Sequence, residues 1–110
     1  MKMMVMAVTR KTLATQIQHG TTVLELWAPW CGPCKIMSPM MASLEAELPM
    51  QVVTMNIDDD KSVAEQFHIQ SIPAMIVYHE GKPYEKIVGA YPKAKLKAHL
   101  EKSIEAAAHA

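Results

Sequence analysis

Two hydrophobic patterns alternate along this chain. In one, apolar residues follow each other in short runs, which is typical of buried strands, and in the other they recur every three or four positions, which is typical of helices packed by one face. Their alternation predicts an α/β domain built on one sheet, in the order β-α-β-α-β-α-β-β-α. We expect one domain over residues 1–110, with strands at 3–8, 22–28, 51–57, 74–79 and 84–89.

Capping residues set the expected ends of three of the helices. Thr9 can cap a helix over residues 11–19, which Gly20 ends. The acidic run 58–60 offers caps for a short helix that follows it, and Pro92 can occupy the first position of the last helix. A cation site at 58–60 is a weaker interpretation, because calcium loops spread their ligands over about a dozen residues.

The remaining helix is long and carries one apolar stripe. It begins near Cys31 or Cys34 and ends by Leu48, and Pro39 in its interior should kink it. Its apolar side chains recur at helical spacing, at Met37, Met40, Met41, Leu44 and Leu48. The ten methionines of the chain are therefore expected to fill core space, for which methionine is well suited.

The connections between the strands predict a mixed sheet. Helices join the first three strands, and such crossovers link parallel strands. The last two strands are joined by a short glycine-containing loop at residues 80–83, which indicates an antiparallel hairpin.

Composition and charge narrow the function classes. Eleven basic residues balance eleven acidic ones, so there is no basic excess of the kind that a nucleic-acid or acidic-membrane partner usually requires. The apolar run near the N-terminus, at residues 3–8, is shorter than the core of a signal peptide or a membrane span. We therefore expect a cytoplasmic protein with no nucleic-acid or membrane partner, and by default a monomer.

The chain has only two cysteines, Cys31 and Cys34. A disulfide between them closes a four-residue loop, which in the chain-entropy model stabilises a fold by only about 2 kcal/mol. Such a pair suits reversible opening better than structural cross-linking. Two unreactive buried thiols and a non-catalytic binding module remain weaker interpretations. So does a structural zinc site, because zinc takes four ligands and the five histidines are scattered, so no metal is expected.

The expected position of the cysteines assigns them different roles. Cys31 lies at the exposed N-terminal tip of the long helix, where unpaired N–H groups and a partial positive charge favour the reactive thiolate. Cys34 lies one turn further in, within reach of a disulfide. Cys31 should therefore attack a substrate disulfide, and Cys34 should resolve the mixed disulfide. Pro33 lacks an N–H group, which costs little in a first helical turn.

Together with its neighbours, this pair resembles the active site of the thioredoxin family. The resemblance rests on the segment Trp27-Ala28-Pro29-Trp30-Cys31-Gly32-Pro33-Cys34-Lys35, with Pro39 behind it, and on Asn56-Ile57-Asp58, Ser71-Ile72-Pro73 and Val88-Gly89-Ala90 at the family's intervals. It implies the thioredoxin fold, a five-stranded mixed sheet flanked by four helices. It also implies a redox carrier that reduces protein disulfides, is itself reduced by a thioredoxin reductase and needs no bound cofactor.

Two relatives of that function stay open as alternatives. One is a specialised member that oxidises its substrates, and the other is an interaction subunit without catalysis. The Gly32-Pro33 dipeptide between the cysteines resembles the reducing members, since oxidising and isomerising members usually carry a histidine there.

Glu25 is the anomaly of the second expected strand, because burying a carboxylate among apolar neighbours is unfavourable without a partner. Members of the family carry a buried aspartate at this offset, six residues before the first cysteine. The resemblance therefore implies that Glu25 accepts the proton of Cys34. A tolerated glutamate at a wet strand position is the alternative. Many members also place a lysine near that acid, where this chain has Thr54.

The resemblance further implies a docking face for substrates. The bond before Pro73 is cis in the family, and the backbone of Ile72 should pair with an extended substrate segment. Trp27 should pack beneath the active-site loop, and Lys35 either adds positive potential or is a solvated helix residue. The other residues of the expected face are Trp30, Gly32, Gly89 and Ala90, although Gly89 could instead mark a strand bulge.

Overall fold

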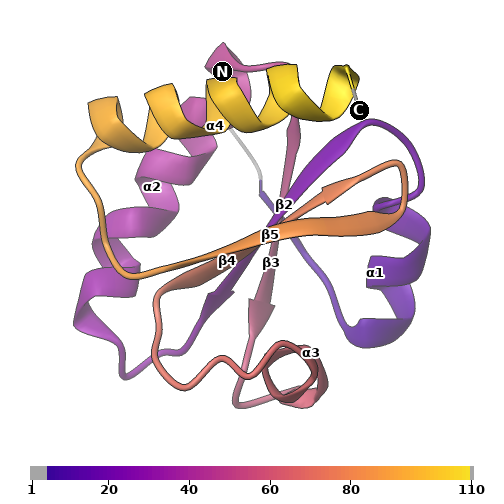
Figure 1. The fold of residues 1–110 in the computed structure, drawn as a ribbon. Helices are drawn as coiled ribbons and strands as arrows, with labels where there is room; N and C mark the ends of the chain where they lie inside the picture. Colours follow the sequence, from indigo (N-terminus) through magenta and orange to yellow (C-terminus); the bar gives the residue numbers. More distant parts are fainter. Residues whose placement is uncertain (1–4, 110) are drawn as a thin grey trace.

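The structure, a computed structural model, describes residues 5–109, so residues 3 and 4 of the first expected strand lie outside it. Within this range the elements follow the predicted order (Figure 1). The strands are β1 (Met6–Ala7), β2 (Thr21–Trp27), β3 (Gln51–Asn56), β4 (Ala74–His79) and β5 (Lys82–Val88), and the helices are α1 (Arg10–Gln16), α2 (Gly32–Glu47), α3 (Ser62–Gln66) and α4 (Lys93–Ala108).

The five strands form one mixed sheet in the order β1-β3-β2-β4-β5. β1 and β2 both run parallel to β3, while β4 is antiparallel to β2 and to β5. The predicted mixed sheet is therefore confirmed. β2 occupies the centre, and its first six residues are buried, as expected for the most continuous apolar run in the chain.

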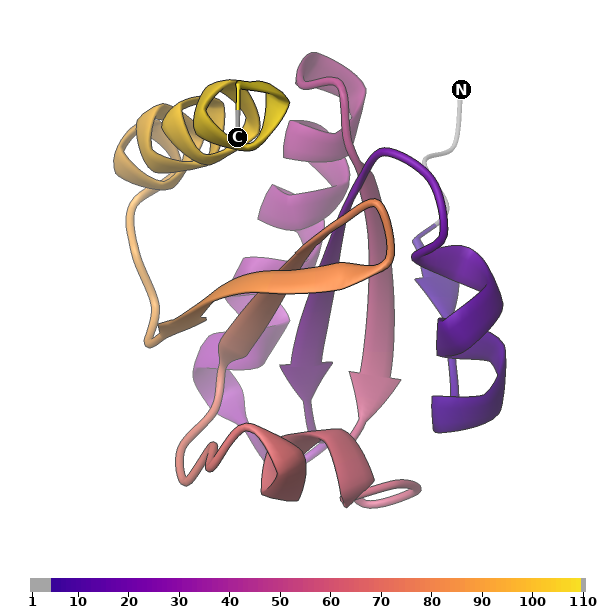
Figure 2. The ribbon, with the colours of Figure 1, turned by 45° about the vertical axis from the view of Figure 1, so that its right-hand side comes forward.

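Helices cover both faces of the sheet (Figure 2). Because side chains alternate along a strand, β2 sends Leu24 and Leu26 to one face and Val23 to the other. The first face packs against α1 and α3, and the second against α2 and α4. Glu25 points to the same face as Val23, so the sheet aims this carboxyl at α2.

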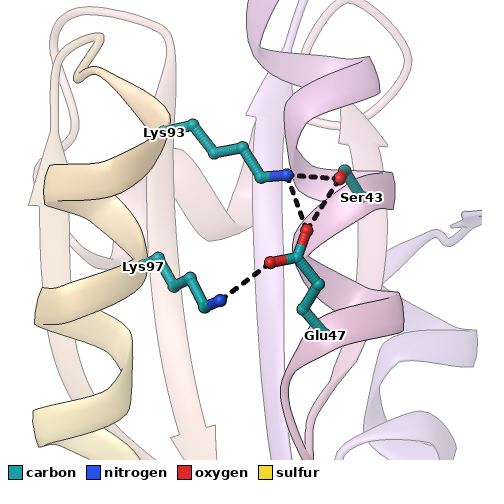
Figure 3. Close-up of polar contacts among 4 residues, drawn as sticks. All are labelled: Ser43, Glu47, Lys93 and Lys97. Atoms are coloured by element: carbon teal, nitrogen blue, oxygen red, sulfur yellow. Dashed lines mark hydrogen bonds and ion pairs between the residues drawn. The ribbon is translucent and has the colours of Figure 1, made fainter.

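An ionic cluster joins the two helices of that second face (Figure 3). The Glu47 carboxylate, near the end of α2, accepts hydrogen bonds from Lys93 at 2.6 Å and from Lys97 at 2.9 Å, both on α4. Ser43 donates to the same carboxylate at 3.1 Å and accepts from Lys93 at 2.7 Å. These bonds, that of Lys93 foremost, lower the pKa of Glu47 to about 2.

Only one of the three predicted helix starts is confirmed as predicted, that of Thr9 before α1. The N-cap of α3 is Lys61, without a side-chain cap, and Pro92 is the N-cap of α4 rather than its first residue. Thr9 forms a capping box with Thr12 at the start of α1, but α1 ends at Gln16, before the expected position 19. Asp60 accepts hydrogen bonds from the backbone N–H of Ser62 at 2.9 Å and of Arg10 at 3.0 Å. One carboxylate therefore joins the start of α3 to the start of α1.

The hairpin turn is tighter than predicted. The expected four-residue loop at 80–83 is a two-residue turn, and β5 begins at Lys82. Glu80 and Gly81 both have positive φ, 50° and 85°, as the common two-residue hairpin turn requires. Pro83 is tolerated within β5 because β5 is an edge strand and the register shifts beside it, between Val77 and Tyr78.

Removing the charge of Glu47 should loosen the contact between α2 and α4. We expect Glu47→Gln to lower the thermal midpoint slightly at neutral pH, with the difference fading in about 1 M salt because exposed ion pairs are screened. The pKa of Glu47 is lowered on folding, so its contribution is present above its ordinary value of 4.5 and is lost as the pH falls toward 2. Thermal unfolding over pH and salt measures this.

Asp59→Asn is the matched control, because Asp59 is an exposed acid in a turn. A Glu47→Gln variant that behaves like this control at every pH and salt concentration would show that the cluster contributes nothing to stability.

Candidate active site

The cysteines lie at the junction of β2 and α2. A short loop follows Trp27, and Cys31 occupies the N-cap position of α2. Cys31 and Cys34 form a disulfide with their Cα atoms 5.3 Å apart, and the Cys34 N–H points at the Cys31 sulfur at 3.2 Å. The end of the helix therefore directs a backbone donor at the sulfur that sequence reasoning assigned to attack.

The expectation that Cys31 is exposed at the helix tip is wrong for this disulfide form. Cys31 is 4% exposed and Cys34 is 1% exposed. The two cysteines pack with Ala28 against the side chains of Trp27, Ile57 and Ile72. Tight apolar packing around the sulfurs explains the difference, and the outer of the two is still Cys31. Gly32 and Pro33, between the cysteines, are exposed.

The two tryptophans of the motif lie in different environments. Trp27 is half-buried against the cysteine cluster, whereas Trp30 is 68% exposed and donates from Nε1 to Asp58 at 3.1 Å. A shallow depression of about 290 Å³ lies beside Trp30. Its walls are mainly apolar and come from the loop before α2, from α3 and from the loops on both sides of α3, at Trp30, Ile57, Ala64, Ile69, Gln70, Ser71 and Ile72.

The segment before β4 lies against the cysteines as the resemblance implied. The Ile72–Pro73 bond is cis, and Ile72 packs on the cysteine cluster. Gly89 donates its N–H to the carbonyl of Pro73 at 2.9 Å, which brings Gly89 and the exposed Ala90 beside this turn. Gly89 has φ +113°, a conformation that favours glycine, and the strand bulge lies elsewhere, at Val77/Tyr78.

Glu25 is fully buried in the middle of the sheet, which overturns the alternative of a wet strand position. Its strand neighbours are Thr54 on β3 and Met75 on β4. Oε2 accepts a hydrogen bond from the Ser38 hydroxyl at 3.0 Å, and Oε1 has no partner among the described residues. Burial raises the pKa of Glu25 to about 7, although the bond from Ser38 lowers it in part.

The resemblance to the family implied that Thr54 lies near Glu25, and the register places Thr54 directly beside Glu25. It did not identify Ser38, which supplies the hydrogen bond that Glu25 does have. The signal was present, because Ser38 lies four residues after Cys34 and so on the same face of α2. A cavity of about 370 Å³ opens here, lined by Val5, Trp27, Cys34, Lys35, Ser38 and Thr54.

Other kinds of site are not evident in the part of the chain that the structure describes. Over residues 5–109, no group of three or more histidine, cysteine or acidic side chains is arranged to hold a metal ion. None of the helices in that range combines the length and the hydrophobicity that crossing a bilayer demands.

A solved structure with a similar fold supports the architecture. A mutant thioredoxin from Halobacterium salinarum NRC-1 matches with a TM-score of 0.80, covering 90% of this chain and 91% of that one. The two sequences are 19% identical, so this match concerns the fold alone.

Sequence relatives extend the match to the family. The family model for thioredoxin matches residues 4–102. Thioredoxin from Staphylococcus saprophyticus is 34% identical over 104 residues, which are 93% of this chain and the whole of that protein. Thioredoxin from Staphylococcus aureus strain Mu50 is 32% identical over the same share of each chain. The chain therefore belongs to the thioredoxin family, and it is a protein thiol–disulfide oxidoreductase with Cys31 and Cys34 as its redox pair.

Proposed function

We propose that this protein reduces disulfide bonds of other proteins in the cytoplasm and is itself reduced by a thioredoxin reductase. The observation that carries the proposal is the Cys31–Cys34 disulfide at the N-terminus of α2, beside an apolar depression. The cysteine pair itself stores the two electrons, so no bound cofactor is needed. The protein acts as a monomer. Its cellular role is in electron transport and cell redox homeostasis.

The reaction transfers two electrons from the cysteine pair to the substrate. The Cys31 thiolate attacks one sulfur of the substrate disulfide, forming a mixed disulfide and releasing the other substrate sulfur as a thiolate. Cys34 then loses its proton and attacks the Cys31 sulfur. This second step releases the remaining substrate thiolate and leaves the pair oxidised, which is the state that the structure describes.

The turn before β4 is suited to bind the substrate backbone. Among residues 5–109, neither the N–H nor the carbonyl of Ile72 has a hydrogen-bonded backbone partner. Ile72 nevertheless lies against the cysteine cluster. An extended substrate segment could therefore pair with Ile72 in the manner of strand addition. The surrounding docking face is formed by Trp30, Gly32, Gly89 and Ala90.

Glu25 is the proton acceptor that we assign to Cys34. It is buried behind α2, and its pKa of about 7 lets it take up a proton at neutral pH and release it again. The proton passes from the Cys34 thiol to the carboxylate during the second step and returns to solvent afterwards. Lys35 adds positive potential at the start of α2 but is exposed, so its effect is small.

A turnover assay with a trapping variant tests the proposed activity. With dithiothreitol as reductant, the wild-type protein should catalyse reduction of the insulin disulfides, whereas Cys31→Ser should be inactive because the attacking sulfur is missing. Cys34→Ser should accumulate mixed disulfides with substrates, since they cannot be resolved. Absence of both turnover and trapped substrates would favour the non-catalytic interaction subunit.

The redox potential of the pair separates a reductant from an oxidant. The potential can be measured by equilibration in glutathione or dithiothreitol buffers. We expect a value near the roughly −270 mV already known for thioredoxin itself, rather than near the roughly −120 mV of strong oxidants. A value at the oxidising end would support the specialised oxidising relative instead.

Removing the Glu25 carboxylate tests the proton acceptor. We expect Glu25→Gln to slow resolution of the mixed disulfide by roughly 10²-fold near neutral pH, as is typical when a general base is lost. The first step, attack by Cys31, should change much less. Stopped-flow measurement of both steps with a small disulfide checks this, and equal slowing of both steps or no slowing of the second would contradict the role.

The raised pKa of Glu25 also predicts how stability depends on pH. The folded protein holds this proton up to about pH 7, whereas an unfolded glutamate loses it near 4.5. The contribution of Glu25 to the free energy of unfolding is therefore fully present below pH 4.5. It is lost as the pH rises through 7, and the loss is on the order of 3 kcal/mol.

Chemical denaturation of the oxidised protein at several pH values measures this loss. Glu25→Gln has no carboxyl to titrate and should not show this loss. The difference in free energy of unfolding between the variant and the wild type should therefore change in favour of the variant as the pH rises. Glu65→Gln, at an exposed position on α3, is the control and should follow the wild-type curve. Parallel curves for the wild type and Glu25→Gln would mean that the carboxyl titrates normally.

A further inference from the structure

Ser38 hydrogen-bonds to the Glu25 carboxyl and to the backbone of Cys34. Its hydroxyl oxygen lies 3.0 Å from Oε2 of Glu25 and 3.0 Å from the backbone carbonyl oxygen of Cys34. Serine in a helix often bonds back to the carbonyl four residues earlier, so the second contact is common by itself. The unusual element is the first contact, which makes the same hydroxyl a partner of a fully buried carboxyl.

A hydroxyl has one proton to donate, so the two contacts cannot both be donated at once. When Glu25 is ionised, it can only accept, and Ser38 must turn its proton toward Oε2. When Glu25 is protonated, the carboxyl can donate to the Ser38 oxygen, and Ser38 is then free to donate to the Cys34 carbonyl. The ionised state of Glu25 therefore fixes the direction of the hydroxyl, and the protonated state permits the opposite direction.

We propose that Ser38 is the positioning residue of Glu25, and that its hydroxyl reverses direction each time this carboxyl gains or loses its proton. The inference rests on the proposed role of Glu25 and deepens it. It explains how the carboxyl is held in one place in both states, although Oε1 has no partner among the described residues. A reversible partner suits a group that must accept a proton and release it in every cycle.

Among the described residues around Glu25, Ser38 is the one that hydrogen-bonds to its carboxyl. The strand neighbours of Glu25, Thr54 and Met75, carry no charge, so neither can neutralise the carboxylate. On α2, the charged side chain at the adjoining cavity is Lys35, while Cys34 is held in the disulfide and carries a proton only in the reduced protein. None of the ion pairs in the described part of the chain involves Glu25.

Ser38 also connects Glu25 to the cavity that Cys34 lines. Ser38, Cys34 and Thr54 line this cavity of about 370 Å³, whereas Glu25 lies behind it. Among residues 5–109, Ser38 alone both hydrogen-bonds to Glu25 and lines the cavity. The carboxyl is therefore joined to the lining of the cavity beside Cys34 by this hydroxyl.

Titration of the Glu25 carboxyl by carbon-13 NMR in the oxidised protein tests the inference without relying on catalysis. In Ser38→Ala, the titration midpoint should rise by about one pH unit, because a hydrogen bond to an ionised group shifts its protonation equilibrium by roughly tenfold or more. Ser38→Thr keeps a hydroxyl and should titrate close to the wild type. Ser43→Ala, a serine on the same helix away from the cysteines, should leave the midpoint unchanged.

A measurement on the unmodified protein covers the case in which Ser38→Ala does not fold. If the hydroxyl reverses, the carbonyl carbon of Cys34 should shift with the same midpoint as the Glu25 carboxyl. A Cys34 carbonyl that stays constant through the titration of Glu25 overturns the reversal. A Glu25 midpoint that is the same in wild type and Ser38→Ala overturns the positioning role.

Resolution kinetics distinguish this inference from the proposed role of Glu25. Ser38→Ala should move the pH profile of resolution upward by the same amount as the NMR midpoint, and should have no further effect in a Glu25→Gln background. If Glu25→Gln leaves resolution unchanged while Ser38→Ala still raises the midpoint, the general-base role fails and the positioning role stands. If Glu25→Gln slows resolution but Ser38→Ala moves neither the profile nor the midpoint, only the positioning role fails.

Discussion

The position of β2 at the centre of the sheet is the constraint on which both halves of the redox site depend. β2 is hydrogen-bonded on both sides and buried on both faces, so its course is fixed. It ends at Trp27, and α2 begins at Gly32, which leaves only a short loop between them. Cys31 must therefore cap the helix, and the next turns of α2 must pass over the face of β2 that carries Glu25.

A buried carboxyl at this place lowers the stability of the fold at neutral pH. An apolar residue at position 25 would complete the face formed by Val23, Met75 and the stripe of α2. The carboxyl instead sits there with one hydrogen bond and with its pKa raised to about 7. The fold tolerates the buried carboxyl because extensive apolar packing surrounds Glu25. At the other end of α2, the ion pairs of Glu47 with Lys93 and Lys97 also hold α2 against α4.

The sequence predicted the order of the elements, the parallel and antiparallel pairings and the pairing of the two cysteines, because these follow from local patterns and from a well-marked motif. It did not predict the partner of Glu25, since Ser38 becomes one only after α2 packs across β2. The burial of Cys31 and the tight turn at Glu80 were also missed. The burial of Cys31 depends on residues as distant in sequence as Ile72. The turn at Glu80 is accompanied by a hydrogen bond from the N–H of Gly20, 60 residues earlier, to the Glu80 carboxylate.

The backbone of Ile72, which has no hydrogen-bonded backbone partner among residues 5–109, bears on which proteins the proposed docking face can bind. A partner that adds a strand there must offer an extended segment on both sides of its own disulfide, and a tightly folded partner must first unfold that segment. Selection then depends on the local unfolding free energy of the partner more than on its side chains. Partners with frayed or misfolded regions around a disulfide would react ahead of compact ones, whatever their sequence.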